Sequence, residues 1–412
     1  MVMETKKRII FFVSEFPVIS ETFIEREIFE LYKRNNLDIK VVTLKSIDAY
    51  NYPELKDIVS IVQITPLNIV LGKFRFLFTK PAALFETLQL ALKNKSDSLL
   101  SNIYTWIKSV GYADVIARYK ADHIHVHFFS RPSTIALFVS SLLGIPYSVS
   151  GHARDVFGSE DAPLQRPEMI KQKVAHAKFV TLCNKKAFDA CIKEVSDVDK
   201  TKVHLLYHGV DFAMLKKVAR SMPNEIPMIY FVGRFVSKKG LVYLLEAAKI
   251  LKEDKVPFKI KLAGFGPEYA DLQKTTEEYD LLKYIEFVNN GKGIDNFAAL
   301  ELMCKADIFV MPSIDLNDGD SDGIPNNLLE AGLFSRPVVA TNAGSIGELI
   351  EDKKTGLLIN QRDAIQLSVS IKTLIHDKEF AAALGENLHN VVAQKFDSAK
   401  NIVDLEALFL KR

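Results

Sequence analysis

The sequence predicts an α/β protein made of two domains, each with a parallel sheet. Short apolar runs alternate with helical patterns along the whole chain, which is typical of parallel strands connected by helices. The chain has 412 residues, which is long for a single hydrophobic core. Its composition, with 48% hydrophobic and 25% charged residues, is that of a soluble globular protein. We therefore expect two domains of ordinary size.

The expected strands form two series along the chain. The first series comprises Arg8–Val13, Ile39–Leu44, His123–Phe128, Tyr147–Ser150, Phe179–Leu182 and Val203–Leu206. The second series comprises Met228–Val232, Lys259–Leu262, Ile285–Val288, Ile308–Met311 and Pro337–Ala340. Residues 208–227 show no strand pattern and contain two prolines and a glycine, so we expect the domain boundary near residue 210. Residues 378–412 have apolar positions at helical spacing and no strand candidate.

Net charge and cysteine content exclude several classes of protein. A formal charge of +2 gives no electrostatic case for binding nucleic acid. The three cysteines, Cys183, Cys191 and Cys304, cannot all pair and have no metal-binding spacing, so we expect reduced thiols in a cytoplasmic protein. The apolar run Ile9–Val13 is too short for a signal peptide, and no apolar stretch is long enough to cross a bilayer.

Two carboxylates eight residues apart, Asp322 and Glu330, mark the most informative stretch, which reads as strand, acidic loop, short helix and strand. Ile324, Pro325 and Asn326 are expected to open the helix, because proline suits the first helical turn. A helix N-terminus offers free N–H groups and a partial positive charge to a phosphate. A nearby carboxylate would accept hydrogen bonds from sugar hydroxyls. The combination suits a sugar nucleotide, and a solvated acidic loop is the alternative.

Two glycine-containing turns follow strands of the second series. The turn Gly233–Gly240 carries Arg234 and Lys239. Ligands dock at such strand-to-helix turns of an open parallel sheet, and two cations there suit a diphosphate. The alternative is a surface turn with solvated cations. Gly264 and Gly266 follow the next strand, and this short pattern by itself indicates only a tight turn.

The segment from Asp322 to Glu330 resembles the Glu-x7-Glu motif of retaining glycosyltransferases of family 4, which have the GT-B fold. It departs from that motif at its first position, where aspartate replaces glutamate and loses a methylene of reach. The resemblance implies that Glu330 binds ribose hydroxyls and that Asp322 holds the transferred sugar. It also implies that the helix N-terminus at Ile324, Pro325 and Asn326 stabilises the departing diphosphate.

The two glycine-containing turns carry the same resemblance. The turn Gly233–Gly240 is similar to the family's G-R-x-x-x-x-K-G turn, which implies that Arg234 and Lys239 grip the leaving nucleoside diphosphate. Gly264 and Gly266 resemble a G-x-G-P loop beside the donor nucleotide. Because cationic side chains would neutralise the phosphates, we expect no metal and no cofactor.

A further motif follows the first strand. Ser20, Glu21 and Thr22 stand where most members of the family have glycines, and this variant resembles the subgroup that builds colanic acid and related bacterial exopolysaccharides. From the residues alone, Ser20 is a helix cap with Glu21 and Thr22 in the first turn, and this interpretation stands beside ligand contact.

Histidines mark the carboxyl ends of two strands of the first series. His152 follows Tyr147–Ser150, at the end of a strand where ligands bind, and resembles the family's histidine that contacts the donor sugar. His123, His125 and His127 alternate, so a strand projects all three from one face. Neighbouring ligands on one strand are about 7 Å apart, too far to share a zinc ion, so we expect a buried, hydrogen-bonded row. His127, nearest the strand end, is the one expected to reach the cleft.

Residues 71–120 combine cations with aromatic side chains. Eight Lys and Arg residues against three carboxylates give this segment a charge of +5. Phe74, Phe76, Phe78 and Trp106 lie among the cations. Exposed on a helical face, they would sit on an anionic membrane surface. Packed inward, they would fill the core of the first domain, and both interpretations remain open.

The resemblance covers nearly the whole chain and implies a GT-B protein of two facing Rossmann-like domains with a central cleft. We expect an acceptor-side domain at 1–207, a nucleotide-sugar-binding domain at 208–388 and a C-terminal helix at 389–412 that packs back on the first domain.

The implied activity is retaining transfer of a hexose from a nucleotide-diphosphate sugar to a glycan acceptor. The expected acceptor is lipid-linked, and the expected setting is bacterial exopolysaccharide or lipopolysaccharide biosynthesis. The catalytic candidates are Arg234, Lys239, His152 and Asp322. The alternatives are a nucleotide-sugar epimerase of the same fold and a non-catalytic sugar-nucleotide-binding subunit. We expect the protein in the cytoplasm, with the inner face of the cell membrane as a candidate partner.

Overall fold

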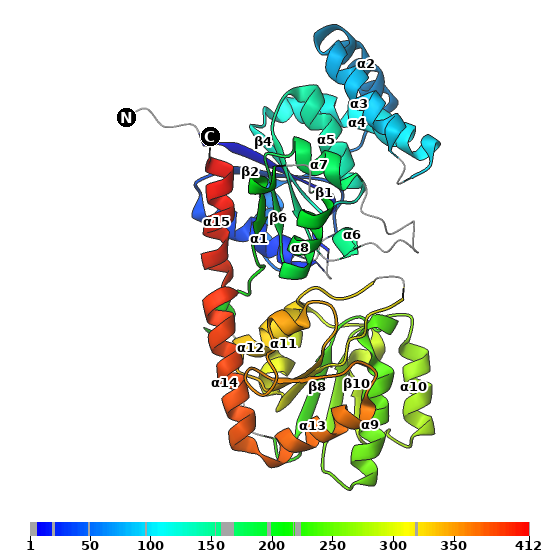
Figure 1. Cartoon of the computed structure of the whole chain (residues 1–412), viewed down its shortest axis with the longest axis vertical. Helices are drawn as coiled ribbons and strands as arrows, with labels where there is room; N and C mark the ends of the chain where they lie inside the picture. The colour runs from blue at the N-terminus through cyan, green and yellow to red at the C-terminus, as the bar shows by residue number, and fades with distance from the viewer. Residues whose placement is uncertain are drawn as a thin grey trace. The chain divides into compact units, whose positions relative to one another are not determined.

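The chain folds into two compact units in a computed structural model (Figure 1). The structure describes residues 6–18, 21–47, 50–94, 97–152, 154–157, 169–195, 199–216, 218, 224–317 and 320–411. The first unit, here the first domain, comprises residues 1–208 and 399–412, and the second domain comprises residues 209–398. The division therefore falls one residue beyond the expected boundary at 207. The second domain also extends ten residues further than expected, to Ser398 rather than residue 388.

The first domain is built on a parallel sheet with the strand order β3-β2-β1-β4-β5-β6-β7. Its strands are β1 (Arg8–Glu15), β2 (Asp38–Lys45), β3 (Val59–Ile61), β4 (His123–His127), β5 (Tyr147–Gly151), β6 (Phe179–Leu182) and β7 (Val203–Leu205). Six of them coincide with the expected strands to within two residues. The edge strand β3 was not expected, because three partly exposed residues are too few to show a hydrophobic period.

Helices cover both faces of this sheet. They are α1 (Thr22–Arg34), α2 (Pro66–Thr79), α3 (Pro81–Lys93), α4 (Leu99–Ile116), α5 (Arg131–Leu143), α6 (Arg154–Phe157), α7 (Ile170–His176), α8 (Lys185–Glu194) and α15 (Ser398–Leu410). Successive residues of β1 alternate between two cores, as the pleat of a strand requires. Ile10 and Phe12 pack with α4 and α5, whereas Ile9 and Phe11 pack with α1 and α15.

The second domain has a parallel sheet with the order β10-β9-β8-β11-β12-β13. Its strands are β8 (Met228–Val232), β9 (Lys259–Ala263), β10 (Ile285–Phe287), β11 (Ile308–Met311), β12 (Val338–Thr341) and β13 (Leu357–Ile359). Its helices are α9 (Leu241–Glu253), α10 (Tyr269–Glu278), α11 (Asn296–Lys305), α12 (Asn326–Leu333), α13 (Ala364–His376) and α14 (Lys378–Lys395). The last strand, β13, has three residues and was not expected.

Both sheets have a topological switch point, where the chain returns to the middle and continues in the other direction. It lies between β1 and β4 in the first domain and between β8 and β11 in the second. Loops after these strands leave the sheet at its carboxyl edge and flank a crevice in which ligands of open α/β sheets bind. The strand order thus directs attention to the loops after β8 and β11.

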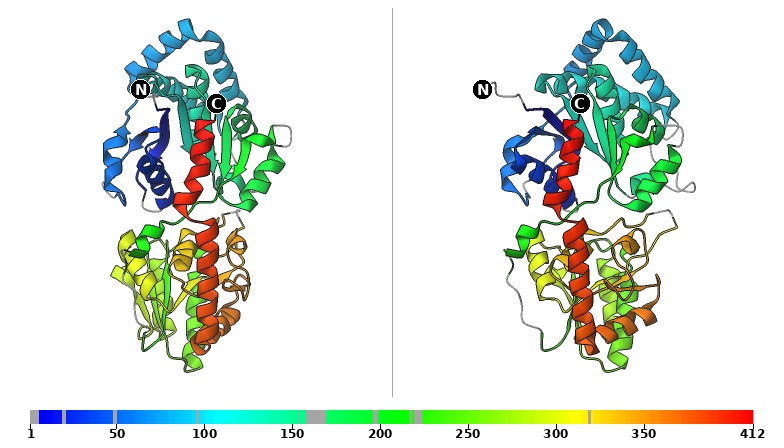
Figure 2. Two further views of the ribbon diagram at one scale, coloured as in Figure 1. Left: turned by 90° about the vertical axis from the view of Figure 1, so that its left-hand side faces the viewer. Right: turned by 60° about the vertical axis from the view of Figure 1, so that its left-hand side comes forward.

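The C-terminal residues form two helices, as their helical spacing predicts. The second of them, α15, packs on the sheet of the first domain (Figure 2). The Phe409 ring contacts the rings of Phe11, His123 and Phe179. Arg34 forms an ion pair with Glu406 at 2.9 Å. The expected C-terminal helix that packs back on the first domain is confirmed, and it begins at Ser398 rather than at residue 389.

The described residues form no helix long and apolar enough to cross a membrane.

Candidate functional site

Two loops are pressed together at the carboxyl edge of the second sheet. The Gly233 N–H donates to the carbonyl of Ala263 at 3.0 Å, and the Phe235 N–H donates to that of Phe265 at 2.7 Å. A side chain at Gly264 would come within 1.8 Å of the Gly233 carbonyl oxygen. Glycine is therefore required where the backbones approach most closely, and the loop after β9 buttresses the turn after β8.

The turn after β8 also contacts the loop after β11. Gly240 adopts φ +61°, and a Cβ there would lie 2.1 Å from the carbonyl oxygen of Pro312. Glycine thus lets the start of α9 approach the other side of the switch point. In consequence, Lys239 Nζ lies 2.7 Å from Asp322 Oδ2, and Lys238 Nζ lies 3.5 Å from Asp322 Oδ1.

Asp322 is a buried carboxylate in a positive environment. Burial by itself would raise its pKa, but Lys239 and Lys238, with hydrogen bonds from Lys239 and Ser313, lower the pKa below its ordinary value. The Ser313 hydroxyl donates to Oδ2 at 2.8 Å. Asp322 is therefore ionised near neutral pH, and the cation expected to face the diphosphate lies directly beside it.

Lys238 and Arg234 complete the cationic group of this turn. Lys238 pairs with Asp320 at 3.0 Å. Arg234 is exposed, and its guanidinium forms no ion pair or hydrogen bond with the described residues. An unengaged guanidinium beside the switch point is available for an anionic ligand, and its planar fork matches the oxygens of a phosphate.

The helix after the acidic loop is α12, and its start is tied to β8. Pro325 occupies the N-cap with φ −64° rather than the first turn, so the expected position is corrected by one residue and Asn326 is the first helical residue. Ile324, Pro325 and Asn326 are partly exposed. The Asn327 side chain donates to the carbonyl of Val232, which holds the helix N-terminus against the turn that carries Arg234.

Glu330 lies in the second turn of α12 and is only 5% exposed. Burial, and secondarily the Glu330 carboxylate, raise the pKa of Tyr230 on β8. The side chain therefore lies near the central strand of the sheet.

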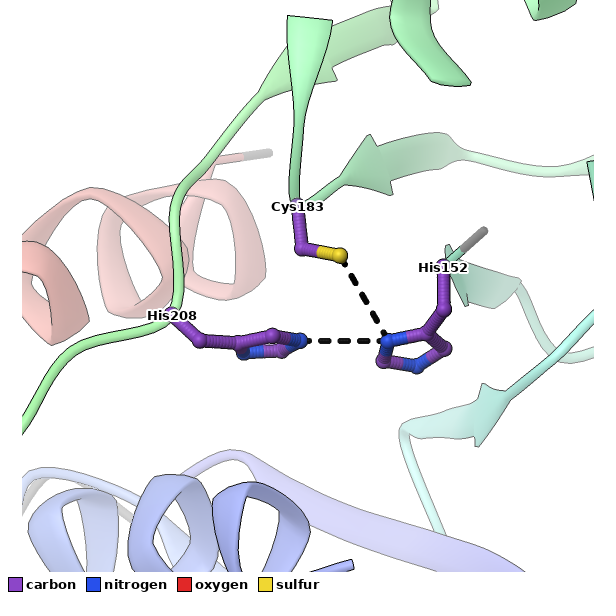
Figure 3. A group of neighbouring side chains, drawn as sticks. All are labelled: His152, Cys183 and His208. Carbon is purple, nitrogen blue, oxygen red and sulfur yellow. Dashed lines mark hydrogen bonds between the residues drawn. The ribbon is translucent and has the colours of Figure 1, made fainter. Parts of the chain in front are cut away.

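The first domain gathers polar side chains at the carboxyl edge of its own sheet. His152 follows β5, Cys183 follows β6 and His208 follows β7 (Figure 3). His152 Nδ1 lies 3.2 Å from His208 Nε2 and 3.7 Å from Cys183 Sγ. Asp155 fixes the backbone here by accepting the N–H groups of His152 and Phe129.

These histidines are held neutral. Burial, followed by the neighbouring His208 and His127, keeps the pKa of His152 well below its ordinary value. Burial is also the main cause that lowers the pKa of His208 to about 4. At neutral pH their ring nitrogens therefore include lone pairs that can accept a hydrogen bond or bind an electrophile.

The alternating histidines of β4 form the expected buried row. His123 and His125 each lie 2.7 Å from the Ser148 hydroxyl, and His125 also contacts Ser150 at 3.1 Å. His127, nearest the strand end, lies 3.3 Å from His152. Burial lowers the pKa of His123 to about 3.

The motif after β1 is described in part. Ser20 lies outside the described residues. The helix α1 begins at Thr22, and Glu21 lies at the N-cap rather than in the first turn. The Glu21 side chain forms no capping hydrogen bond to the helix.

Several residues of these sites were not singled out as functional candidates from the sequence. They are Lys238, Ser313, Asn327, Cys183 and His208. The last two directly follow predicted strands, so their position at strand ends was a usable signal. Lys238 was seen only as part of the turn.

Comparisons with known proteins identify the fold. Residues 216–391 match the family model for glycosyl transferases group 1. The solved structure of a glycosyltransferase from Rickettsia africae aligns with 99% of this chain at a TM-score of 0.71 and 16% identity, covering all of that chain. Anabaena HepE, solved in complex with UDP and glucose, aligns with 97% at a TM-score of 0.70 and 17% identity, covering 98% of its own chain. The fold is GT-B.

Sequence relatives point to the same class. A putative colanic acid biosynthesis glycosyltransferase, WcaL of Escherichia coli K12, is 34% identical over 169 residues, which cover 41% of each chain. The counterpart from Salmonella typhimurium is 32% identical over 47% of this chain. The matched regions span less than half the length of these two relatives, 41% and 45%. Together with the family match, they support a GT-B glycosyltransferase.

Proposed function

We propose that this protein is a retaining hexosyltransferase of glycosyltransferase family 4. It moves a hexose from a nucleotide-diphosphate sugar to a glycan acceptor in the biosynthesis of a bacterial exopolysaccharide or lipopolysaccharide. The observation that carries the proposal is the group of charges at the switch point of the second sheet, where Arg234 and Lys239 follow β8 and Asp322 follows β11. The colanic acid relatives support the exopolysaccharide setting.

The second-domain residues bind the donor in this proposal. Arg234 and Lys239 neutralise the diphosphate, and the exposed N–H groups at the start of α12 add a partial positive charge. Negative charge grows on the diphosphate as the bond to the sugar breaks, so these cations stabilise the transition state more than the ground state. Gly264 and Gly266 keep the neighbouring loop close enough to shape the nucleotide pocket.

Lys239 changes partner when the donor binds. In the ligand-free protein its ammonium group is paired with Asp322 at 2.7 Å. A bound diphosphate attracts the same ammonium, which leaves the Asp322 carboxylate able to accept hydrogen bonds from sugar hydroxyls. Glu330 binds the ribose, and His152 contacts the transferred sugar. The leaving phosphate acts as the base, and no metal takes part.

The acceptor is lipid-linked, and the enzyme reaches it at an anionic membrane surface. Helix α2 supports this step, because its apolar residues Leu67, Leu71, Phe74 and Phe78 recur at helical spacing and are 47–79% exposed. Lys73, Arg75 and Lys80 are exposed on or next to the same helix. An apolar stripe beside cations matches the interface of a bilayer that carries anionic lipids.

The neighbouring helices extend this surface. Phe85 on α3 is 62% exposed, and Leu100 and Tyr104 on α4 are 81% and 56% exposed. The aromatic residues of the segment 71–120 divide between core positions and exposed positions. Phe76 is buried and Trp106 is partly buried, with its ring N–H donating to Thr87, whereas Phe74 and Phe78 face outward.

A thermal-shift screen of nucleotide-diphosphate sugars tests the donor. A ligand that binds only the folded state raises the unfolding temperature, so one donor should produce a concentration-dependent rise. The rise should shrink in Lys239→Ala and persist in the matched surface variant Lys274→Ala. If no nucleotide sugar or nucleoside diphosphate shifts the transition, the proposal is wrong. Release of free sugar products without any acceptor would instead favour an epimerase.

A further inference from the structure

Three potential metal ligands converge at the carboxyl edge of the first sheet, outside the donor-binding loops. His152 Nδ1, Cys183 Sγ and His208 Nε2 all lie within 4.8 Å of one another (Figure 3). They come from three successive strand ends, after β5, β6 and β7. No sequence spacing connects them, so the fold alone brings them together.

The separations of these atoms match the edges of a tetrahedral zinc site. Zinc binds nitrogen at about 2.0–2.1 Å and sulfur at about 2.3 Å, so two nitrogens lie about 3.3 Å apart and a nitrogen and a sulfur about 3.6 Å apart. The observed separations are 3.2 Å for the two nitrogens and 3.7 Å for His152 Nδ1 and Cys183 Sγ. Two of the three edges therefore have the length that an ion requires, and the ligand atoms of Cys183 and His208 lie within 4.8 Å of each other.

Cys183 and His208 compete for one hydrogen-bonding position on His152. A neutral imidazole nitrogen has one lone pair in the ring plane. Both Cys183 and His208 point at the same atom, His152 Nδ1, and only one of them can donate to that lone pair with good geometry. An ion between the three atoms would take one lone pair from each.

His152 is the first of a chain of polar groups that runs through His127 to Glu27. Metal-binding histidines commonly contact a carboxylate through such groups. His152 Nε2 lies 3.3 Å from His127 Nδ1, and His127 Nε2 lies 3.2 Å from Glu27 Oε1. His127 Nε2 and Glu27 Oε1 are buried, and neither forms a hydrogen bond of good geometry within the described part of the chain. A metal on His152 Nδ1 fixes the proton on Nε2, which then donates to His127, so that His127 carries its own proton toward Glu27.

We propose that His152, Cys183 and His208 bind one divalent ion of the zinc class. Two imidazoles and a thiolate are soft or borderline ligands, which suit Zn²⁺ and exclude Ca²⁺ and Mg²⁺. Cys183 and His208 are partly exposed, so a fourth position is open to water or an inhibitor. The neighbouring group of Glu27, His125 and His127 is a poorer site, since both ring nitrogens of His125 already contact Ser148 and Ser150.

Zinc binding would then inhibit sugar transfer. This consequence rests on the proposed function, because it requires His152 to contact the transferred sugar. An ion on Nδ1 would fix the ring and occupy the space in front of it. Metal binding itself is independent of any donor or acceptor, so the two ideas can fail separately.

Cobalt titration of the purified, metal-free full-length chain tests the site without a substrate. Co²⁺ should bind at one equivalent, give the intense visible absorption of a tetrahedral site and show a thiolate-to-cobalt charge-transfer band. Added Zn²⁺ should displace it. Cys183→Ser should lose the charge-transfer band and weaken cobalt binding about 100-fold or more. Glu27→Gln should weaken binding less, by about 10–100-fold, because Glu27 acts on the ligands only through His127.

Cys191→Ala is the matched control, because Cys191 is a fully buried cysteine on α8 of the same domain. It should leave the cobalt spectrum and stoichiometry unchanged. Circular dichroism checks that each variant is folded. If Cys183→Ser does not fold, His208→Asn provides a second ligand variant. Octahedral, thiolate-free cobalt spectra, or equal binding by the ligand variants and the control, would overturn the proposal.

Discussion

At the scale of single residues, the proposed function depends on the charges at the second switch point. Arg234 is exposed and unengaged by the described residues, whereas Lys239 is paired with the buried Asp322. The two cations are therefore not equivalent before a ligand arrives. In the proposed function, Arg234 attracts the diphosphate directly, whereas Lys239 shares its charge between the diphosphate and Asp322.

Removal of either cation should lower turnover. Arg234→Ala and Lys239→Ala should each reduce kcat by about 10²-fold or more, the range measured for lost electrostatic donors. Steady-state kinetics on the purified variants measures this. Lys274→Ala is the control, because Lys274 is an exposed partner of Glu278 on α10, and pairs of that kind contribute little. Near-normal turnover in both test variants would remove these cations from the mechanism.

The pH dependence of stability should report the Asp322 ion pairs. The pKa of Asp322 is lower in the folded protein than its ordinary value near 3.9, so its contribution is present above that pH and is lost as pH falls through the folded pKa. Asp322→Asn should therefore lower Tm at pH 7 and have a smaller effect near pH 3, which lies below the ordinary pKa of aspartate, so that the contribution of the ion pairs has begun to decline. An equal change in Tm at both pH values would contradict the ion-pair account.

At the scale of elements, glycine positions bring the loops together. Gly240 combines φ +61° with a contact to the Pro312 carbonyl that leaves no room for a side chain. Gly240→Ala should destabilise the protein by about 1–3 kcal/mol or more and should separate Lys239 from Asp322. Thermal unfolding and donor binding measure the two effects. Gly347→Ala is the control, because its Cβ would meet no atom closer than 3.4 Å.

The exposed stripe of α2 should bind anionic vesicles. Each basic residue near such a surface contributes about 1 kcal/mol, and the attraction weakens as salt rises. Replacing Lys73, Arg75 and Lys80 with Glu, or Phe74 and Phe78 with Ser, should release the protein in co-sedimentation assays without unfolding it. The control is Ile365→Ser on α13, which changes a 69% exposed apolar residue of the second domain.

No binding of the wild-type protein to anionic vesicles at low salt would contradict membrane docking by α2. The donor site would be unaffected by that result, because its residues belong to the other domain.

Strand and helix prediction succeeded where the hydrophobic pattern was long enough. Residues 228–232 and 308–311 have continuous apolar runs, as strands buried on both faces do, whereas residues 259–263 alternate lysine with apolar residues at their start. β3 and β13 have three residues each and give no such pattern. The outward stripe of α2 could not be separated from a core-facing one, because an amphipathic pattern does not say what its apolar face contacts.

At the scale of the whole molecule, the sequence predicts two doubly wound domains and a returning C-terminal helix. It also singles out the residues of the proposed donor site, because each belongs to a local motif; their roles stay predictions. The positions of His152, Cys183 and His208 after predicted strands were a signal for an edge of the sheet, but not for their contact, since the three residues lie on separate loops and meet only through tertiary structure. Strand geometry put neighbouring histidines about 7 Å apart, whereas the rings of His125 and His127 turn toward each other with centroids 5.2 Å apart.

The most direct test of the central claim follows the transferred sugar by NMR. The donor selected by thermal shift is incubated with a glycan acceptor and excess chelator, and the anomeric signals of donor and product are compared. The account predicts transfer with the donor's anomeric configuration retained, at a rate that the chelator does not lower. An inverted product, or activity that is lost in chelator and restored by magnesium or manganese, would contradict it.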